Sequence, residues 1–197
     1  MFTGIVEEIG QVASVMAGRV TLSACRSVGA LQVGESVAVN GVCLTVVSVD
    51  TSTFAADLSE ETCRLTNLGF VRPGDFVNLE RSMRLSDRIG GHLVSGHVEG
   101  IGTVQRRTMT NDAVEIGINV PTDILKYCIS KGSLAVDGVS LTINAVSTTG
   151  VVIMLIPHTL QVTTLGQRQV GDRVNLESDL IGKYVERLIS RGANAGD

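Results

Sequence analysis

The sequence predicts a mainly β protein, built from two tandem small barrels and followed by one C-terminal α-helix. Three observations lead to this prediction: an internal duplication, short alternating segments typical of strands, and an apolar stripe with helical spacing near the C-terminus. The chain has 197 residues, of which 44% are hydrophobic and 18% charged, enough for one or two globular domains.

The duplication is collinear over four blocks. TGIVEEIGQV, which begins at Thr3, returns as SGHVEGIGTV from Ser95, 92 positions later. SVAVNGVCLTVVSV, TCRLTNLG and GDFVNLE each return 97 positions later in similar form. Repeats of this length are domains rather than solenoid units. We therefore expect a first barrel at residues 1–88, a second at 89–179, and a helix with its tail at 180–197.

The elements of each repeat are predicted mainly as strands. Residues 36–49 alternate around Asn40-Gly41, and residues 133–146 alternate around an Asp-Gly pair; both pairs indicate type I′ hairpins. FVNLE and RVNLE alternate behind a Gly-Asp turn, whereas residues 59–68 and 121–130 indicate short helical turns. Six or so short strands in about 90 residues suit a small closed barrel.

The tail after the second repeat predicts an amphipathic helix. Its apolar face carries Leu180, Ile181, Tyr184, Val185, Leu188 and Ile189. The helix has no counterpart in the first repeat, so its apolar face has to be buried elsewhere. Assembly with other copies of the chain is the main expectation, and packing on its own barrels is the alternative.

Composition excludes several classes of partner. The net charge is −4 without a basic cluster, and there is no Trp, which argues against nucleic-acid binding. The longest aliphatic run, at residues 151–156, is too short to span a membrane. Glu7 and Glu8 stand where a signal peptide would be basic, so we expect a cytoplasmic protein.

Cysteine spacing and known motifs suggest neither metal nor cofactor. Cys25, Cys43, Cys63 and Cys128 lack the spacing of a zinc site, and free thiols are expected in a reducing compartment. No nucleotide-binding glycine loop and no HExxH pattern occurs.

Positions where the repeats differ are the first candidates for chemistry. Cys43 is replaced by Ser140 in the second repeat. Each is either a nucleophile or proton donor, or a small core residue. Thr45 and Thr142 lie two residues further along and share the face of Cys43 and Ser140. Such a polar strip inside a dry barrel would need a ligand or a hydrogen-bond partner.

The second repeat also gains a histidine and a lysine. Ile5 becomes His97, which is either a proton carrier or a surface histidine. Lys131 replaces a glycine and either holds an anionic ring oxygen or is solvated. Gly4 and Gly96 precede Ile5 and His97 and allow close approach of a ligand, or merely a bulge.

Several motifs in order resemble one known family. MFTGIV, NGVCLTV, IGGHLVSGHV, DGVSLTI and LIPHTLQVTTLG together are similar to the riboflavin synthase family of the alpha-chain, lumazine-binding type, from Met1 to about Glu186. The resemblance implies two six-stranded Greek-key barrels, a C-terminal helix that holds a homotrimer together, and one lumazine per barrel. A non-catalytic lumazine- or flavin-binding fluorescent protein with the same duplicated barrel is the alternative.

The implied reaction joins two molecules of 6,7-dimethyl-8-ribityllumazine at a centre shared by neighbouring chains. A four-carbon unit passes from one to the other, giving riboflavin and 5-amino-6-ribitylaminouracil without a metal or redox cofactor. His97 is the preferred proton carrier, and Asp179 assists proton traffic. The attacking group is left open between Cys43, Ser140 and water, as is the barrel that holds the donor.

The resemblance also implies which residues line the two sites, with Phe2 closing over the ligand. The first site would consist of Gly4, Ile5, Val6, Ser36, Cys43, Leu44, Thr45, Asp57, Leu58, Ser59, Glu60, Glu61 and Thr62. The second would consist of Gly96, His97, Val98, Lys131, Ser140, Leu141, Thr142, Met154, Leu155, Ile156, Pro157, His158 and Thr159.

Overall fold

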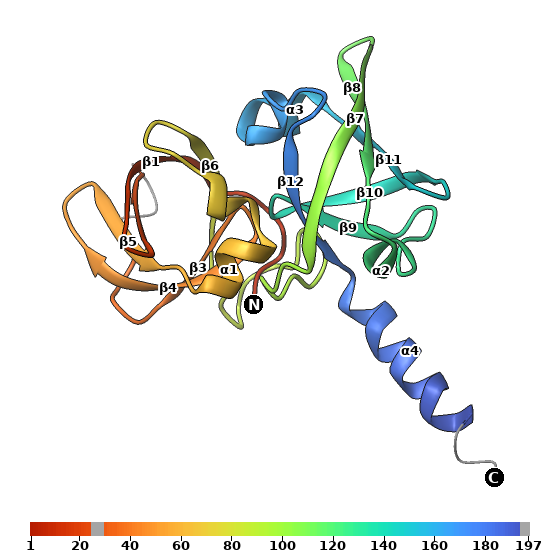
Figure 1. Cartoon of the computed structure of the whole chain (residues 1–197), viewed down its shortest axis with the longest axis horizontal. Coiled ribbons are helices and arrows are strands. Elements are labelled where there is room, and N and C mark those ends of the chain that lie inside the picture. The colour runs from red at the N-terminus through yellow and green to blue at the C-terminus, as the bar shows by residue number, and fades with distance from the viewer. Residues whose placement is uncertain (25–29, 194–197) are drawn as a thin grey trace.

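Each repeat folds into a closed barrel of six antiparallel strands, as the sequence predicts (Figure 1). The computed structural model describes residues 1–24 and 30–193. The first barrel has the closed order β1-β2-β5-β4-β3-β6, and the second has the equivalent order β7-β8-β11-β10-β9-β12. In each barrel the second strand pairs with the fifth and not with the third, and the sixth strand lies between the third and the first. This order is the Greek-key pattern.

The elements follow one another in the same order in both repeats. The first repeat contains β1 (Glu8–Met16), β2 (Arg19–Ser23), β3 (Ser36–Val39), β4 (Val42–Val49), β5 (Thr53–Asp57), α1 (Glu60–Leu65), the 3₁₀ helix η2 (Asn67–Phe70) and β6 (Phe76–Arg81). The second contains β7 (Gly100–Thr110), β8 (Ala113–Asn119), α2 (Thr122–Leu125), β9 (Ser133–Val136), β10 (Val139–Val146), β11 (Gly150–Leu155), α3 (Pro157–Val162), the 3₁₀ helix η3 (Thr164–Gly166) and β12 (Arg173–Ser178).

The hairpin predictions are confirmed in both barrels. Asn40 and Gly41 have φ angles of 46° and 79°, and Asp137 and Gly138 have φ angles of 46° and 78°. Two consecutive residues with positive φ form the type I′ turn, for which Asn-Gly and Asp-Gly are suited. Register shifts occur at equivalent places in β1 and β7, and again in β4 and β10. Bulges of this kind bend the strands enough to close a small barrel.

Aliphatic side chains fill the interior of both barrels. The first core includes Leu22, Leu44 and Leu79, and the second includes Ile143, Leu155 and Leu176, each at most 4% exposed. A six-stranded barrel is narrow enough for its own side chains to fill it. Neither interior therefore has room for a ligand ring.

The barrels meet at the tips of the two equivalent hairpins. A Cβ at Gly41 would lie 2.7 Å from the amide nitrogen of Gly138, so only glycines fit there. Buried polar groups surround this contact: Asn67 Nδ2 donates to Asp137 Oδ1 at 2.8 Å, and Asn175 Nδ2 donates to the Asn40 carbonyl at 2.9 Å. The network ties both hairpins into one polar interface, and it was not predicted from the sequence.

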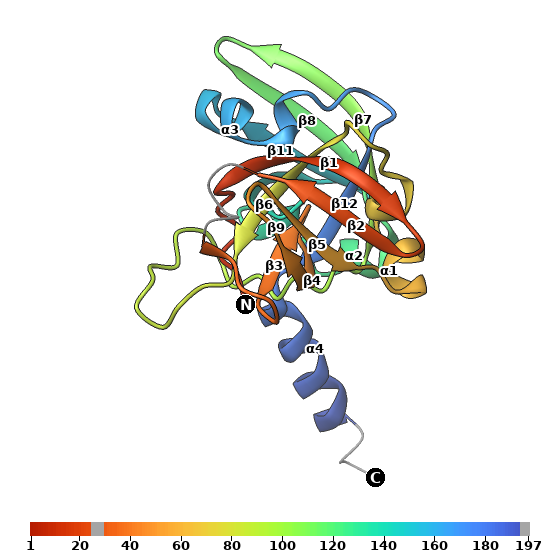
Figure 2. The ribbon, with the colours of Figure 1, turned by 90° about the vertical axis from the view of Figure 1, so that its left-hand side faces the viewer.

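The C-terminal helix α4 (Leu180–Ala193) projects away from both barrels (Figures 1 and 2). Its start is held by Lys183 and Glu99 at 2.7 Å, and further along by Lys126 and Glu186 at 2.7 Å. The apolar face remains open, since Ile181, Tyr184, Val185, Leu188 and Ile189 are 49–69% exposed. Packing of this face on the chain's own barrels is thereby excluded.

Two further sequence predictions can be compared with the described residues. Cys43, Cys63 and Cys128 are free thiols, whereas Cys25 lies outside the described part of the chain. Within that part, no helix is long and apolar enough to cross a membrane. The cytoplasmic location stays a prediction.

Candidate functional site

The short segments that precede β1 and β7 cross over to the opposite barrel. The Ser140 amide donates to the Gly4 carbonyl at 2.8 Å, and the Cys43 amide donates to the Gly96 carbonyl at the same distance. A Cβ added at Gly4 would lie 2.6 Å from the Cβ of Ser140, so glycine is required there. Val6 packs on the second core. By symmetry, Val98 packs on the first.

This crossing corrects the grouping expected from the sequence. Gly4, Ile5 and Val6 lie beside the second barrel rather than the first, and Gly96, His97 and Val98 lie beside the first. We call Cys43–Thr45 with residues 57–62 and 96–98 the Cys43 half-site. Ser140–Thr142 with residues 154–159 and 4–6 form the Ser140 half-site.

Two buried glutamates hold the crossing segments. Glu80, at the end of β6, accepts hydrogen bonds from the Thr3 amide at 2.7 Å and the Gly4 amide at 3.1 Å. Glu177, at the equivalent place in β12, accepts them from the Ser95 and Gly96 amides at 2.7 and 3.0 Å. Burial raises the pKa of Glu80, and the amides of the anchored segment oppose that rise. The sequence signal was the Glu that ends both GDxVNLE blocks.

The polar strip of each repeat lies on the outer wall of its barrel. Val42, Leu44 and Val46 are buried, whereas Cys43 is half-buried and Thr45 is exposed. Ser140 and Thr142 alternate with buried residues in the same way on β10. The shared face of each pair is confirmed, but the expectation that this face lines a barrel interior is wrong. A ligand that uses the polar strip would therefore bind on the outer wall of the barrel.

Four leucines expected to line the sites point into the barrel cores instead. Leu44, Leu58, Leu141 and Leu155 are at most 8% exposed and belong to the aliphatic interiors. Their outward-facing neighbours are the residues available to a ligand.

The end of β5 runs beside the start of β4 and completes the Cys43 half-site. Val46 pairs with Ala56, which places Asp57 and the turn into α1 near Cys43. Asp57 is held by Arg19, whose Nε lies 2.6 Å from Oδ1, and this hydrogen bond lowers the pKa of the Asp57 carboxyl. Ser59 caps α1 by accepting from the Thr62 amide at 3.0 Å. Glu60 and Glu61 are exposed on the first turn of α1.

In the Ser140 half-site the end of β11 lies beside β10, as the end of β5 lies beside β4 in the Cys43 half-site. Ile143 pairs with Ile153, so Met154 and the start of α3 lie beside the Ser140 strand. Pro157 is the first residue of α3, where its fixed φ suits a helix start. Ile156 and His158 are exposed and Thr159 is half-buried.

A buried histidine that the sequence did not single out contacts Ser140 directly. Nδ1 of His92 lies 2.6 Å from Oγ of Ser140, and His92 is 9% exposed. Burial lowers the pKa of His92, while the charges of Asp179 and Glu177 oppose this effect. A neutral imidazole beside a hydroxyl can accept a proton near pH 7.

Of the other two residues predicted to move protons, Asp179 acts on His92, whereas His97 belongs to the Cys43 half-site. Asp179 is half-buried at the start of α4, and its Oδ1 accepts from the Ile181 amide at 3.0 Å. Its charge opposes the lowering of the His92 pKa, and its assistance to proton traffic stays a prediction. His97 is exposed, and its backbone amide donates to Ser95 Oγ at 3.2 Å. It lies with Cys43 rather than with Ser140.

Phe2 and Ser36 both neighbour the polar strip of the first barrel. Phe2 is 0% exposed and packs with Val94, Ala38 and the half-buried Cys43, so it supports the wall from behind rather than closing over a ligand. Ser36 pairs with Thr45 across β3 and β4.

Lys131 is exposed and adopts a φ of 66°. The first repeat uses Gly34 at this position with a φ of 92°, so the lysine accepts a backbone conformation that favours glycine. Among the described residues, no group of three or more His, Cys, Asp or Glu is arranged to hold a metal ion.

Comparison with known proteins gives the same two units. The lumazine binding domain family matches residues 3–82 and again 95–179. A riboflavin synthase of Mycobacterium tuberculosis is 45% identical over 197 residues, covering 96% of this chain and 98% of that protein. A riboflavin synthase of Bacillus subtilis is 40% identical over 195 residues, covering 97% and 91%.

Among solved structures, LumP complexed with 6,7-dimethyl-8-(1'-D-ribityl) lumazine matches with a TM-score of 0.82 and 25% identity, over 90% of this chain and 99% of that one. LumP complexed with riboflavin matches with a TM-score of 0.83 and 27% identity over the same shares. Two matches to the domain family, and relatives of 40–45% identity along nearly the whole chain, place this protein in the riboflavin synthase family of lumazine-binding proteins.

Proposed function

We propose that the protein converts two molecules of 6,7-dimethyl-8-ribityllumazine into riboflavin and 5-amino-6-ribitylaminouracil. The observation that carries the proposal is the pair of equivalent but chemically different half-sites, one with Cys43 and one with Ser140 and His92. Two identical substrates that play different parts need one scaffold twice, with different side chains at the reacting centres.

Each half-site offers one lumazine a backbone edge and a polar strip. The crossing segments place Gly4 and Gly96 directly against the strips, where the absence of a side chain lets each segment contact the backbone of Ser140 or Cys43. Holding two rings face to face in opposite orientation removes most of the entropy cost of a bimolecular step, which can contribute about 7–11 kcal/mol.

The Ser140 half-site is the proposed place of proton transfer. One lumazine has to lose a proton from its 7-methyl group, and the second has to be attacked at C7. His92 accepts the proton through Nδ1, directly or by way of the Ser140 hydroxyl, and Asp179 stabilises the imidazolium that forms. The attacking group at the second ring is Cys43, Ser140 or a water that they orient.

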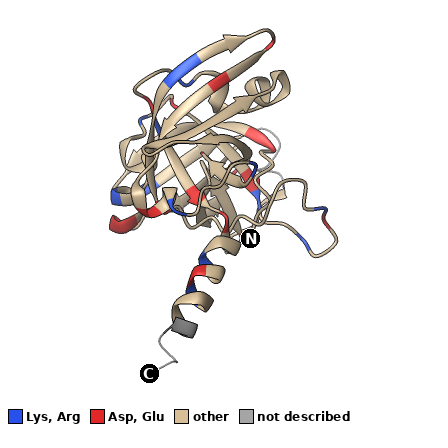
Figure 3. Ribbon diagram, turned by 90° about the vertical axis from the view of Figure 1, so that its right-hand side faces the viewer, with Lys and Arg blue, Asp and Glu red and all other residues tan. Residues whose placement is uncertain are grey.

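The two half-sites that react together belong to neighbouring chains of a homotrimer in this proposal. The support is the open apolar face of α4, which no part of the described chain covers. By helical spacing Lys183, Glu186 and Arg187 fall on the opposite face. Figure 3 shows basic and acidic positions alternating along this helix. A helix that is apolar on one side and projects from its domain is suited to pack against other copies.

The test is turnover by the purified protein. Incubation with 6,7-dimethyl-8-ribityllumazine should produce riboflavin, followed by its absorbance and fluorescence, with two substrate molecules consumed for each riboflavin formed. The Ser140→Ala/His92→Gln double variant is the control for catalysis by the site. Binding of the lumazine without turnover by the wild-type chain would instead favour the non-catalytic lumazine-binding alternative.

A further inference from the structure

A cavity lies between the two barrels, away from both half-sites. Its volume is about 490 Å³, and none of its lining residues belongs to either half-site. This volume is within the range of sites for small organic ligands. Its walls come mainly from equivalent segments, residues 67–76 of the first repeat and residues 164–173 of the second.

The two walls have opposite chemical character although their backbones are equivalent. At matching positions the first repeat supplies aromatic or aliphatic side chains and the second supplies amide or guanidinium groups. The three pairs are Phe70 with Gln167, Val71 with Arg168, and Phe76 with Arg173. The cavity therefore offers an apolar surface on one side and hydrogen-bond donors on the other.

Exposed phenylalanine is confined to this cavity. The chain has four Phe; Phe2 and Phe54 are at most 1% exposed, whereas Phe70 and Phe76 are 55% and 47% exposed. Both exposed rings line the cavity. Two exposed aromatic rings at one hollow are not needed for the barrel cores, and such exposure is typical of a binding surface.

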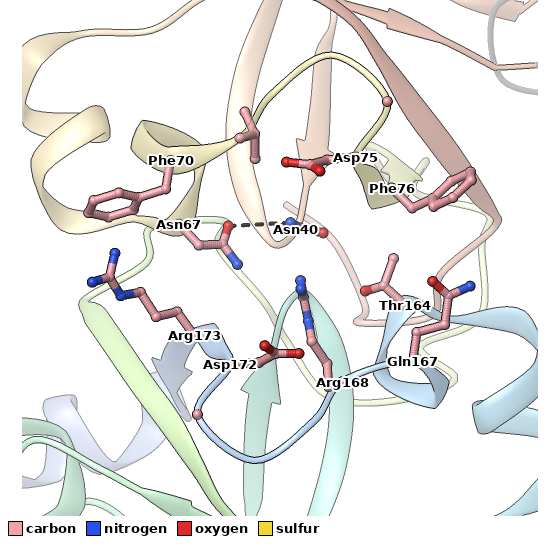
Figure 4. A pocket seen from close by; sticks show the side chains of 13 residues that line it. Asn40, Asn67, Phe70, Asp75, Phe76, Thr164, Gln167, Arg168, Asp172 and Arg173 are labelled. Atoms are coloured by element: carbon pink, nitrogen blue, oxygen red, sulfur yellow. Dashed lines mark hydrogen bonds between the residues drawn. The ribbon is translucent and has the colours of Figure 1, made fainter.

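The opposite wall has spare donors. Arg168 uses Nε and Nη2 on Asp137 Oδ2, at 3.1 and 2.8 Å, which leaves Nη1 for a ligand. The Arg173 guanidinium lies 4.1 Å from the centre of the Phe70 ring and has no carboxylate partner among the described residues. Thr164 Oγ1 is buried and lacks a hydrogen-bond partner within that part of the chain. Figure 4 shows Arg168 reaching the middle of the cavity, between Arg173 on one side and Thr164 on the other.

Two carboxylates also line the cavity, and both accept hydrogen bonds from their own turns. Asp75 accepts from the Arg72 amide at 2.7 Å, and Asp172 accepts from the Gln169 amide at 2.8 Å. Each carboxylate keeps its charge, but the second wall also carries two guanidinium groups, those of Arg168 and Arg173. Guanidinium groups of this kind bind carboxylate and phosphate groups well.

We propose that this inter-barrel cavity binds a planar aromatic anion of nucleotide size. Its anionic group is held by Arg168 and Arg173, and its ring lies against Phe76, since the Phe70 ring is already covered by Arg173. The site is separate from the reaction described above and does not depend on it.

The experiment is equilibrium dialysis of the full chain with three probes, AMP, UMP and 2-naphthoate, at concentrations up to about 10 mM. At least one probe should bind with a stoichiometry of one per chain. Its ring-free and charge-free counterparts, inorganic phosphate and adenosine in the case of AMP, should bind at least about 10-fold more weakly. Saturating riboflavin, added to fill the half-sites, should leave the affinity unchanged.

Two exposed side chains serve as test positions, because their replacement spares the core. Arg173→Gln and Phe76→Ala should each weaken binding about 10-fold. The control is Arg72→Gln, which changes an exposed arginine on the loop before Phe76 that does not line the cavity, and it should have no effect. Absence of binding by all three probes, competition with riboflavin, or equal affinity of both test variants and wild type would overturn the proposal. Loss of turnover without loss of probe binding would bear on the proposed reaction alone.

Discussion

Nδ1 of His92 lies 2.6 Å from Oγ of Ser140, in a position that is 9% exposed to solvent. The pair joins the loop before β7 to the strand β10. Within the described residues Cys43 has no such side-chain hydrogen bond, and the histidine beside it, His97, is exposed. The two half-sites therefore share a backbone and differ in their capacity to move protons.

Replacement of His92 by Gln should reduce kcat about 10²- to 10⁴-fold, the range for loss of a general base, with a smaller change in KM. Gln keeps a hydrogen-bond partner for Ser140 but cannot take the proton. His97→Gln is the matched comparison and should have a smaller effect, because His97 is exposed and lies with Cys43. Steady-state kinetics on both variants decide between the two histidines; a larger loss in His97→Gln would assign the proton to His97.

The buried position of His92 also predicts a pH dependence of stability. Its folded-state pKa is lowered, so the unfolded chain binds the proton more readily as the pH falls. The stability associated with neutral His92 is present above the unfolded pKa of about 6.5 and is lost as pH falls through the lower, folded pKa. Urea unfolding between pH 8 and pH 5 should show a steeper fall in the free energy of unfolding for wild type than for His92→Gln. Parallel curves would contradict this.

The glutamate anchors make a crossed prediction about the half-sites. Glu80 belongs to the first barrel but holds Gly4, which flanks Ser140 in the second. Glu80→Gln should therefore weaken ligand binding at the Ser140 half-site, and Glu177→Gln should weaken it at the Cys43 half-site. Each loss should be about 1–3 kcal/mol, because an amide NH₂ cannot accept from the anchored backbone.

Calorimetric titration with riboflavin can measure this effect on the individual half-sites. Glu115→Gln, which removes only a surface ion pair with Arg106, is the control and should change binding by less than about 1 kcal/mol. If Glu80→Gln weakened the Cys43 half-site instead, the segments would not act on the opposite barrels.

The sequence predicts the barrels well because their signals are local. The Asn40-Gly41 and Asp137-Gly138 pairs select the turn, and the alternation of β4 and β10 selects the register. That alternation also indicates the outer face for Cys43, since its neighbours Val42 and Leu44 are the apolar partners of the core. The outward position of the polar strip could thus have been read from the sequence.

Other features depend on contacts between segments far apart in the chain. Whether Gly4 docks on its own barrel or on the other one follows from the packing of the two hairpins, and no local pattern encodes it. The role of His92 cannot be predicted from the sequence, for a related reason. Its partner Ser140 is 48 positions away, and comparison of the repeats offers no matching residue.

The open face of α4 predicts how assembly can be broken. Wild type should be a trimer of about three times 20.7 kDa, and Leu188→Glu with Ile181→Glu should yield monomers, as should deletion from Leu180 onward. Arg187→Ala, on the polar face, is the control and should stay trimeric. Light scattering reports the mass; a monomeric wild type would remove the assembly role of the helix.

The crossing of the N-terminal segments dictates how shared active centres have to be tested. One variant should lose the Cys43 half-site through Cys43→Ala with Thr45→Ala, and the other should lose the Ser140 half-site through Ser140→Ala with His92→Gln. His97 is left intact in the second variant, because it lies beside Cys43 and its removal would damage both half-sites of one chain.

The two variants are dissociated, mixed in equal amounts and reassembled. If each centre pairs the Cys43 half-site of one chain with the Ser140 half-site of a neighbour, random association leaves about a quarter of the centres with both halves intact. Activity should then rise well above that of either parent, while each variant reassembled with itself shows no gain. If both half-sites of a centre belonged to one chain, every centre would keep its defect and mixing would recover nothing. A flat result with mixed trimers shown by mass would therefore place the reaction within single chains.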